Sequence, residues 1–323
     1  MGRFAIIRLL GVVPQLLLVS LLAFLIMKMA PGDPVASLAG GSPEFVSAYD
    51  HARISRNLGL DAPLHEQYGL WLGRMFRGDW GVALKDGRPV FDLVMYGLKN
   101  TLALVSIVWI VTILGALLLG WLAGSRPDSR WDYAISALAT ASSAVPPFWL
   151  GLLLILVFSV LLGWFPSSGS MPIGEPESLG LRLRHLALPV ATVALTHIGP
   201  YVRLVRSSVR DALSSSFILA ARARGLPRRT IAMRYLLPNA LTPFITWAGF
   251  SLPLLISGTF VIEWLFAWPG LGRQFLQAAL AREYPILMGS VVVVCALVIL
   301  GNVVADAAVA AIDPKLRRKH AGH

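Results

Sequence analysis

AARARGLPRRTIAMRYLLPNAL, residues 220–241, interrupts two long apolar stretches with five arginines, which are Arg222, Arg224, Arg228, Arg229 and Arg234. An arginine at the centre of a bilayer costs about 2.5 kcal/mol or more on insertion scales, so five would cost on the order of 12 kcal/mol. If the flanking stretches cross a membrane, this segment therefore lies outside the hydrocarbon. It marks the end of one span and the beginning of the next.

The same segment contains signals for two short helices. Three serines at 214–216 offer N-caps for the helical run FILAARAR. Gly225 is placed to end that run, and Pro227 suits the first turn of a second helix, RRTIAMRYLL, which we expect to end near Pro238. We therefore predict an ordered loop at about 214–239, with two helices joined at a glycine.

The composition of the 323 residues is that of a membrane protein. Hydrophobic residues make up 56% and charged residues only 14%, whereas a soluble domain carries about 25% charged residues. Apolar runs of about 20 residues, enough to cross a hydrocarbon core of ~30 Å, occur six times. These candidate spans are 9–29, 101–124, 133–163, 186–205, 240–262 and 286–310.

Two of the six runs are not simple spans. The first follows Arg3 and Arg8, as a cleavable signal peptide would, but its apolar stretch is longer than a signal core and no small-x-small cleavage site follows. We interpret it as a retained span. The third is too long for one straight crossing, and Pro146-Pro147 predicts a kink or a short surface helix that leads into the span. We therefore predict an all-α membrane protein with six transmembrane helices.

Lysine and arginine residues in the short loops predict the orientation of these helices. They gather on one side, at the N-terminus, at Arg126 and Arg130, in residues 220–241 and in the tail 313–323. Both termini are therefore expected in the cytoplasm, and the long loop of about 30–98 outside. The net charge of +11 follows from this asymmetry, so no nucleic-acid partner is needed to explain it.

The residues of the arginine-rich loop leave two functions open. An ordinary cytoplasmic loop would use its arginines to fix topology and to contact anionic lipid head groups. Alternatively, the small, flat AARA face would let the surface of another protein approach closely, with arginines at its sides. A loop that serves topology alone does not need two helices joined at a glycine, which slightly favours a docking function.

A family resemblance favours docking more strongly. Ala220-Ala221, then Gly225 after three residues, then Leu237-Pro238 resemble the EAA signature of permease subunits in binding-protein-dependent ABC importers. Within that group, ARARGLPRR is similar to the form found in the dipeptide, oligopeptide and nickel branch.

The resemblance extends over nearly the whole chain. Two positions depart from the general signature, Leu219 in place of Glu and Tyr235 in place of a frequent Ile, and the first departure is common in the peptide branch. Six further blocks resemble those of the family, in its order: MAPGDPV (29–35), LGLDAPLHEQYGLWLGRMFRGDWG (58–81), VPPFWLGLLLILVFSVLLGWFPSSG (145–169), FVIEWLFAWPGLG (260–272), REYPILMG (282–289) and DPKLRR (313–318).

The resemblance implies a type-I ABC importer permease in the bacterial inner membrane, which moves peptides or similar small solutes inward. Residues 1–95 would hold the first transmembrane helix and the long external loop that the peptide branch adds. Residues 96–312 would form the five-helix core with an EAA-like coupling loop at about 214–239. Residues 313–323 would be a basic cytoplasmic tail.

The resemblance also implies the partners of the chain. In the family, the EAA loop is a coupling helix that rests in a groove of a cytoplasmic ATPase subunit. We therefore expect two ATPase subunits, a second, related permease and an external substrate-binding protein. ATP and Mg²⁺ would bind to the ATPase subunits, since this chain has no G-x-x-x-x-G-K-[ST] phosphate loop, and no cofactor is expected in the chain itself. The expected coupling residues are Ala220, Ala221, Arg222, Ala223, Arg224, Gly225, Leu226, Leu237 and Pro238.

An ion-coupled secondary transporter or channel, acting without ATPase partners, is the alternative. Its ionisable groups would be His197, near the middle of the fourth span, and Asp306, in the last. His197 could equally line a substrate path or bond to a neighbouring helix. Catalysis is not expected, because the H-E-x-x-H pattern begun at His65 fails at Gly69. Cys295 is the only cysteine, which excludes disulfides and cysteine-rich metal sites.

The outer loop contains two helix-like pieces, at about 44–58 and 63–76. The second has its large apolar residues largely on one face, and we expect it to lie along the membrane surface or to pack on the spans. The alternative is a docking face for the external binding protein, for which FAWPGLG (266–272) is the other candidate segment.

Overall fold

A computed structural model describes residues 2–29, 61–171 and 178–312. Over these ranges the chain is predominantly helical and contains no β-strand. The helix predicted at 44–58 and the basic tail 313–323 lie outside the described residues.

Among the described residues, three helices are long and apolar enough to cross a membrane. They are α5 (Val90–Gly124), α8 (Leu179–Leu213) and the Tyr284–Ala305 part of α14 (Tyr284–Ile312). They contain the second, fourth and sixth predicted spans. Both α5 and α8 extend to 35 residues, beyond their predicted ends, because an apolar run marks only the part of a helix that faces lipid or core.

The third predicted span is broken at the two prolines. Helix α6 (Arg130–Ala144) meets the segment formed by α7 (Pro147–Leu154) and the π-helix η2 (Ile155–Leu161) at an angle of 104°. Val145 is extended because a proline follows it, with φ −90° and ψ 125°. Pro147 begins the next helix, where its missing N–H costs no hydrogen bond. The predicted kink is confirmed.

The fifth predicted span falls on α11 (Leu237–Gly258) and α12 (Phe260–Leu265), within a stretch bent by 41°. If each bent pair counts as one crossing, the described residues hold up to five candidate spans. Helix α1 (Gly2–Met29) contributes a shorter apolar part, Gly11–Ile26. The total of six spans stays a prediction.

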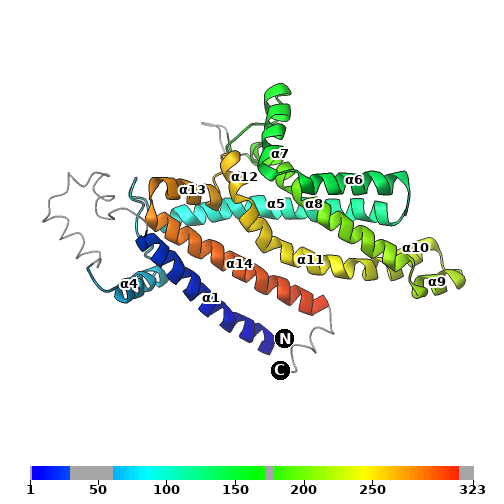
Figure 1. The fold of residues 1–323 in the computed structure, drawn as a ribbon, viewed down its shortest axis with the longest axis horizontal. Helices are drawn as coiled ribbons and strands as arrows, with labels where there is room; N and C mark the ends of the chain where they lie inside the picture. The colour runs from blue at the N-terminus through cyan, green and yellow to red at the C-terminus, as the bar shows by residue number, and fades with distance from the viewer. Residues whose placement is uncertain (1, 30–60, 172–177, 313–323) are drawn as a thin grey trace.

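Figure 1 shows how these helices are arranged. The short helices α9 (Ser216–Ala223) and α10 (Arg228–Thr230) project at one end, and α12 and α13 (Leu271–Ala281) lie toward the other. Helices α1 and α14 pack side by side and antiparallel, so the start of α1 and the end of α14 point in the same direction. Helix α11 begins beside α10 toward this same side of the view and runs away from it to α12.

Among the described residues, the most extensive helix contact lies between α5 and α8. A β-carbon added at Gly120 would stand 2.6 Å from the Cβ of Val205, and one added at Gly124 would stand 2.7 Å from the carbonyl oxygen of Arg206. Only glycine permits this approach. A buried cluster continues from this contact through α6, α8, α9 and α11, so the projecting end is part of the main core.

Candidate functional site

Helix α9 ends at Gly225 through a pair of backbone hydrogen bonds. The N–H of Gly225 donates to the carbonyl of Arg222 at 2.9 Å, and the N–H of Leu226 donates to that of Ala221 at 3.3 Å. This is the Schellman arrangement, which requires a left-handed residue, and Gly225 has φ +70°. The predicted end of the first helix is confirmed.

The second helix of the loop does not end near Pro238, and that prediction is wrong. Helix α10 runs into the π-helix η3 (Ile231–Leu236), which continues directly into α11. Pro238 occupies the first turn of α11, where its missing N–H is tolerated. The side chain of Asn239 donates to the carbonyl of Tyr235 at 2.7 Å and satisfies that group in the wide turn.

The two faces of α9 have different environments. Ile218 and Ala221 are buried in the cluster that contains Val205 and Val209 of α8. Seven residues cover two helical turns, so Ser216, Leu219, Ala220 and Ala223 share the opposite face, and all four are exposed. The exposed face is therefore small except for Leu219.

The expected coupling residues consequently divide into two groups. Ala220, Arg222, Ala223, Arg224, Gly225 and Pro238 are exposed at the surface, whereas Leu226 and Leu237 are partly buried. Ala221 is 2% exposed and packs inward, so it does not form an outer contact as expected. Within the described residues, neither Arg222 nor Arg224 takes part in an ion pair, which leaves both guanidinium groups available to a partner.

Sequence reasoning missed two apolar side chains on this helix. Leu219 is 56% exposed and Phe217 is 39% exposed, although both lie in a segment that the arginines keep out of the hydrocarbon. Exposed apolar groups at such a place mark a contact with another protein more often than a solvated loop. The detectable signal was a leucine at the position where the general signature has a charged residue.

Replacing Ala221 by leucine should destabilise the chain, whereas the same change at Ala220 should not. The added atoms at Ala221 have no space in the cluster, and overpacking costs about 1–3 kcal/mol. At exposed Ala220 the change should stay within roughly 0.5 kcal/mol. Thermal unfolding of both variants in detergent tests this. Equal melting temperatures would contradict the assignment of the inner face.

His197 lies apart from this loop, near the middle of α8. Its Nδ1 is 2.9 Å from the carbonyl of Val193, one turn earlier in the same helix. A carbonyl only accepts, so Nδ1 donates this hydrogen bond, and Nε2 lies toward Gly258. Among the described residues, His197 is therefore hydrogen-bonded within α8 and not to a neighbouring helix, contrary to one of the two interpretations of its sequence position. The side chain of Asp306 lies outside the described residues.

At the opposite end of the molecule, a buried carboxylate holds three helices together. Glu263 of α12 is fully buried, and it accepts the hydroxyl of Thr101 of α5 at 2.6 Å and the N–H of Gly272 at 2.7 Å. The hydroxyl of Thr101 in turn accepts the N–H of Leu271 at 2.8 Å. The first turn of α13 is therefore fixed to α5.

Asn100, next to Thr101, extends this clamp to α8 and to the segment FAWPGLG. Its carbonyl accepts the indole N–H of Trp268 at 3.0 Å, and its side chain accepts a guanidinium N–H of Arg182 at 2.8 Å. Phe266, Trp268 and Leu271 are buried. The large side chains of this segment are thus not available to an external partner, contrary to the expectation.

Helix α4 (Leu64–Phe76) packs on α1, one of the two positions expected for it. The hydroxyl of Tyr68 lies 2.7 Å from that of Ser20, and the rings of Tyr68 and Trp71 contact Phe24. Phe76 and Leu64 stay exposed.

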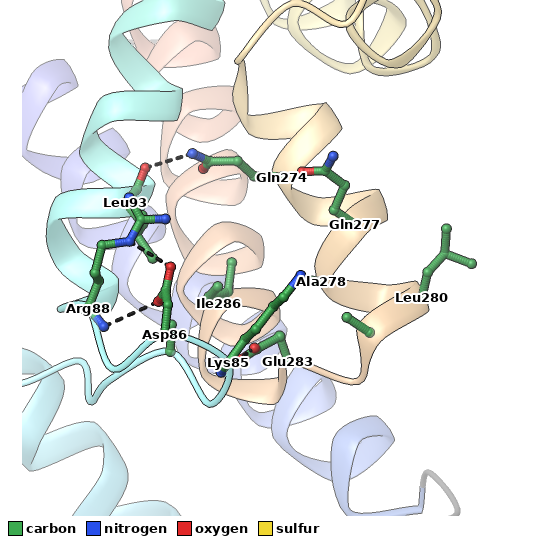
Figure 2. Close-up of a pocket in the computed structure, with 12 residues that line it drawn as sticks. Lys85, Asp86, Arg88, Leu93, Gln274, Gln277, Ala278, Leu280, Glu283 and Ile286 are labelled. Carbon is green, nitrogen blue, oxygen red and sulfur yellow. Dashed lines mark hydrogen bonds and ion pairs between the residues drawn. The ribbon is translucent and has the colours of Figure 1, made fainter. Parts of the chain in front are cut away.

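A pocket of about 730 Å³ lies between the loop 83–88 and α13, and Figure 2 shows the residues that line it. The carboxylate of Glu283 accepts the N–H groups of Leu84 and Lys85, each at 2.7 Å. The ion pair of Arg88 with Asp86, at 2.6 Å, holds the pKa of the aspartate below its ordinary value. These contacts fix the loop on the start of α14.

Residues 1–105 match the family described as the N-terminal membrane component of binding-protein-dependent transport systems. Residues 116–318 match the family described as binding-protein-dependent transport system inner membrane component.

Two relatives cover nearly the full length of the chain. The oligopeptide transport system permease protein AppB of Bacillus subtilis (strain 168) is 38% identical over 317 residues, which are 98% of this chain and 99% of the relative. The glutathione transport system permease protein GsiC of Escherichia coli O1:K1 / APEC is 34% identical over 325 residues, 99% of this chain and 100% of the relative.

A solved structure shares the fold. A chain of the MetNI methionine ABC transporter in an inward-facing conformation superposes with a TM-score of 0.55 and 22% identity, over 68% of this chain and 96% of that one. At this identity the similarity concerns the fold alone. The two family matches and the full-length relatives together establish that the chain belongs to the binding-protein-dependent transport system inner membrane components, the permease family of ABC importers.

Proposed function

We propose that the chain is the membrane-spanning permease of an importer for peptides or similar small solutes, driven through α9 by separate ATPase subunits. The exposed face of Leu219, Ala220 and Ala223 carries this proposal, because it offers a shallow apolar contact with Arg222 and Arg224 beside it. The oligopeptide and glutathione permeases among the relatives support this class of substrate.

The drive requires that ATPase subunits distinguish two positions of α9. A ligand with equal affinity for two conformations shifts neither, however tightly it binds. The inner face of α9 supports the transmission of such a preference, since Ile218 and Ala221 share one packed cluster with α8 and α11. A displacement of the helix therefore acts on the spans directly.

The remaining partners and the topology belong to the same proposal. Both termini and α9 lie in the cytoplasm, and six helices cross the inner membrane. A second, related permease completes the path, and an external substrate-binding protein docks at the α13 end. ATP and Mg²⁺ reside in the ATPase subunits. The start of α1 and the end of α14 both point toward the side of the molecule on which α9 lies. This arrangement supports the proposal that the termini and α9 lie on the same side of the membrane.

Replacing Ala223 by tryptophan should abolish co-purification of the ATPase subunits. Ala223 lies at the C-terminal end of the outer face, between Arg222 and Arg224, where a large ring would hold the partner surface away, while the core of the chain stays intact. The measurement is a pull-down of the detergent-solubilised chain at native expression level. Ala134→Trp is the matched control, because Ala134 is an exposed alanine of α6 outside the loop. Undiminished ATPase recovery with Ala223→Trp would refute the assigned face.

The alternative of an ion-coupled transporter or channel makes the opposite prediction for the same preparation. It requires a chain that purifies alone and moves solute in liposomes without ATP. Nothing in the geometry of His197 favours it, because the ring is bonded within its own helix.

A further inference from the structure

A partly buried ion pair joins α6 to α8, two turns before the end of α8, which leads into α9. The guanidinium of Arg206 holds the carboxylate of Asp132 with two N–H groups, Nε to Oδ1 and a terminal N–H to Oδ2, the latter at 2.9 Å. The side chain of Asp132 is 2% exposed and that of Arg206 is 29% exposed. Bidentate pairs of this kind fix the relative orientation of the two groups as well as their distance.

Asp132 also organises the turn between α5 and α6. Its Oδ2 accepts the backbone N–H of Asp128 at 3.1 Å, and its own N–H donates to the hydroxyl of Ser129 at 3.2 Å. Asp128 has φ +60°, a conformation that a non-glycine residue keeps only when its surroundings hold it. One carboxylate thus holds the turn, the start of α6 and α8 together.

The pair lies on a path that runs from α9 through α8 and then α6 to the bend at Pro146-Pro147. Arg206 stands two turns before the end of α8, which leads into α9 through Ser214 and Ser215. Ile135 of α6 belongs to the same buried cluster as Ile218 of α9. A second hydrogen bond, from Arg203 of α8 to the carbonyl of Ala139 of α6 at 3.2 Å, joins the same helices. Apolar packing alone would allow the helices to slide, and the bidentate pair is the stronger of the two polar links that oppose sliding.

We propose that Asp132 is a positioning residue of the transport cycle, whose ion pair with Arg206 makes α6 move with α8 and α9 as one body. ATPase motion taken up by α9 then reaches the 104° bend between α6 and α7 without slippage. Neither residue touches the ATPase or the solute in this assignment. The inference rests on the proposed function, since it requires ATPase subunits that displace α9.

A distance measurement within the assembled complex tests the inference. Spin labels are placed at exposed Leu138 of α6 and exposed Ser214 at the α8 end, in a chain with Cys295 replaced by serine. Double electron–electron resonance compares the nucleotide-free complex with the complex trapped by ATP and orthovanadate. In the wild type the distance should stay unchanged. In Asp132→Asn it should shift or broaden by about 5 Å in the trapped state, the size of a one-turn slip.

Matched variants separate positioning from folding. Arg210 lies on α8, as Arg206 does, and forms an exposed ion pair with Asp128 at 3.4 Å. Arg210→Ala removes this exposed pair, and the label distance should stay as in the wild type. Arg206→Lys keeps the charge but loses the fork and should give an intermediate shift. If the Asp132→Asn chain does not assemble with its partners, the label distance of the Arg206→Lys complex is compared with that of the wild type instead. In every variant the KM for ATP should stay at the wild-type value. A general loss of structure would change it.

Two results would overturn the inference. One is a wild-type distance that changes between the two states, because α6 then moves independently of α8. The other is a trapped Asp132→Asn or Arg206→Lys complex with the wild-type distance, which reduces the pair to a static contact. A wild-type chain that binds no ATPase subunit is a different outcome, since it refutes the proposed function and is visible before any label is read.

Discussion

Replacing Gly225 by proline should abolish ATP-driven uptake, while the chain still inserts into the membrane. Proline fixes φ near −65°, whereas this position has φ +70°. The substitution also removes the N–H that donates to Arg222. Both bonds that end α9 are lost with the turn, so the outer face of the helix no longer meets the ATPase groove at a defined angle.

Uptake of radiolabelled di- and oligopeptides into proteoliposomes that hold the whole complex measures this effect. Gly225→Ala is the graded control. It keeps the N–H but places a side chain in the left-handed region, which costs about 1–2 kcal/mol, and the open space around Gly225 adds no clash. Uptake should therefore fall only a few-fold. Normal uptake by the proline variant would mean that the geometry of α9 does not carry the drive.

Replacing Glu263 by alanine should cause the largest loss of stability. The change leaves the hydroxyl of Thr101 and the N–H of Gly272 without their acceptor inside a closed part of the core. An orphaned buried donor costs about 1–3 kcal/mol, so the pair should cost about 3 kcal/mol or more. Because the clamp fixes the start of α13, the loss should first be seen at that end of the molecule.

Thermal unfolding in detergent, together with limited proteolysis, measures this loss. Glu263→Gln should be intermediate, since its amide oxygen can still accept one bond while its NH₂ group opposes the other donor. Glu66→Ala is the control, because Glu66 is an exposed glutamate of α4 and its loss should have almost no effect. Equal melting temperatures for Glu263→Ala and Glu66→Ala would refute the clamp.

Features set by neighbouring residues could be predicted from the sequence. The end of α9 depends on one glycine within a helical run, and the break of the third span depends on two adjacent prolines, so both predictions are confirmed. The apolar spans follow from hydropathy for the same reason. The number of crossings and the orientation of the termini depend on the surrounding membrane, and they stay predictions.

Features set by distant contacts could not be predicted. The inward position of Ala221 depends on where α8 passes, and a helix of small residues gives little sign of which side will be covered. The continuation of the helix through Pro238 depends on the wide turn before it. Glu263 bonds to Thr101, 162 positions away, and Asp132 pairs with Arg206, 74 positions away.

The length of α8 gives the molecule a lever. With 35 residues the helix measures about 52 Å, well beyond a hydrocarbon core of ~30 Å. Arg182, near its first turn, is tied to Asn100 of α5, and Gly120 and Gly124 of α5 lie against its far part, so the two helices move as one unit. If this unit tilts by about 5° about the Arg182 end, the far end is displaced by about 4–5 Å, and the middle of the helix by half as much. A displacement of α9 by a few ångströms thus becomes a smaller displacement, with a correspondingly larger force, at the middle of the helix inside the membrane.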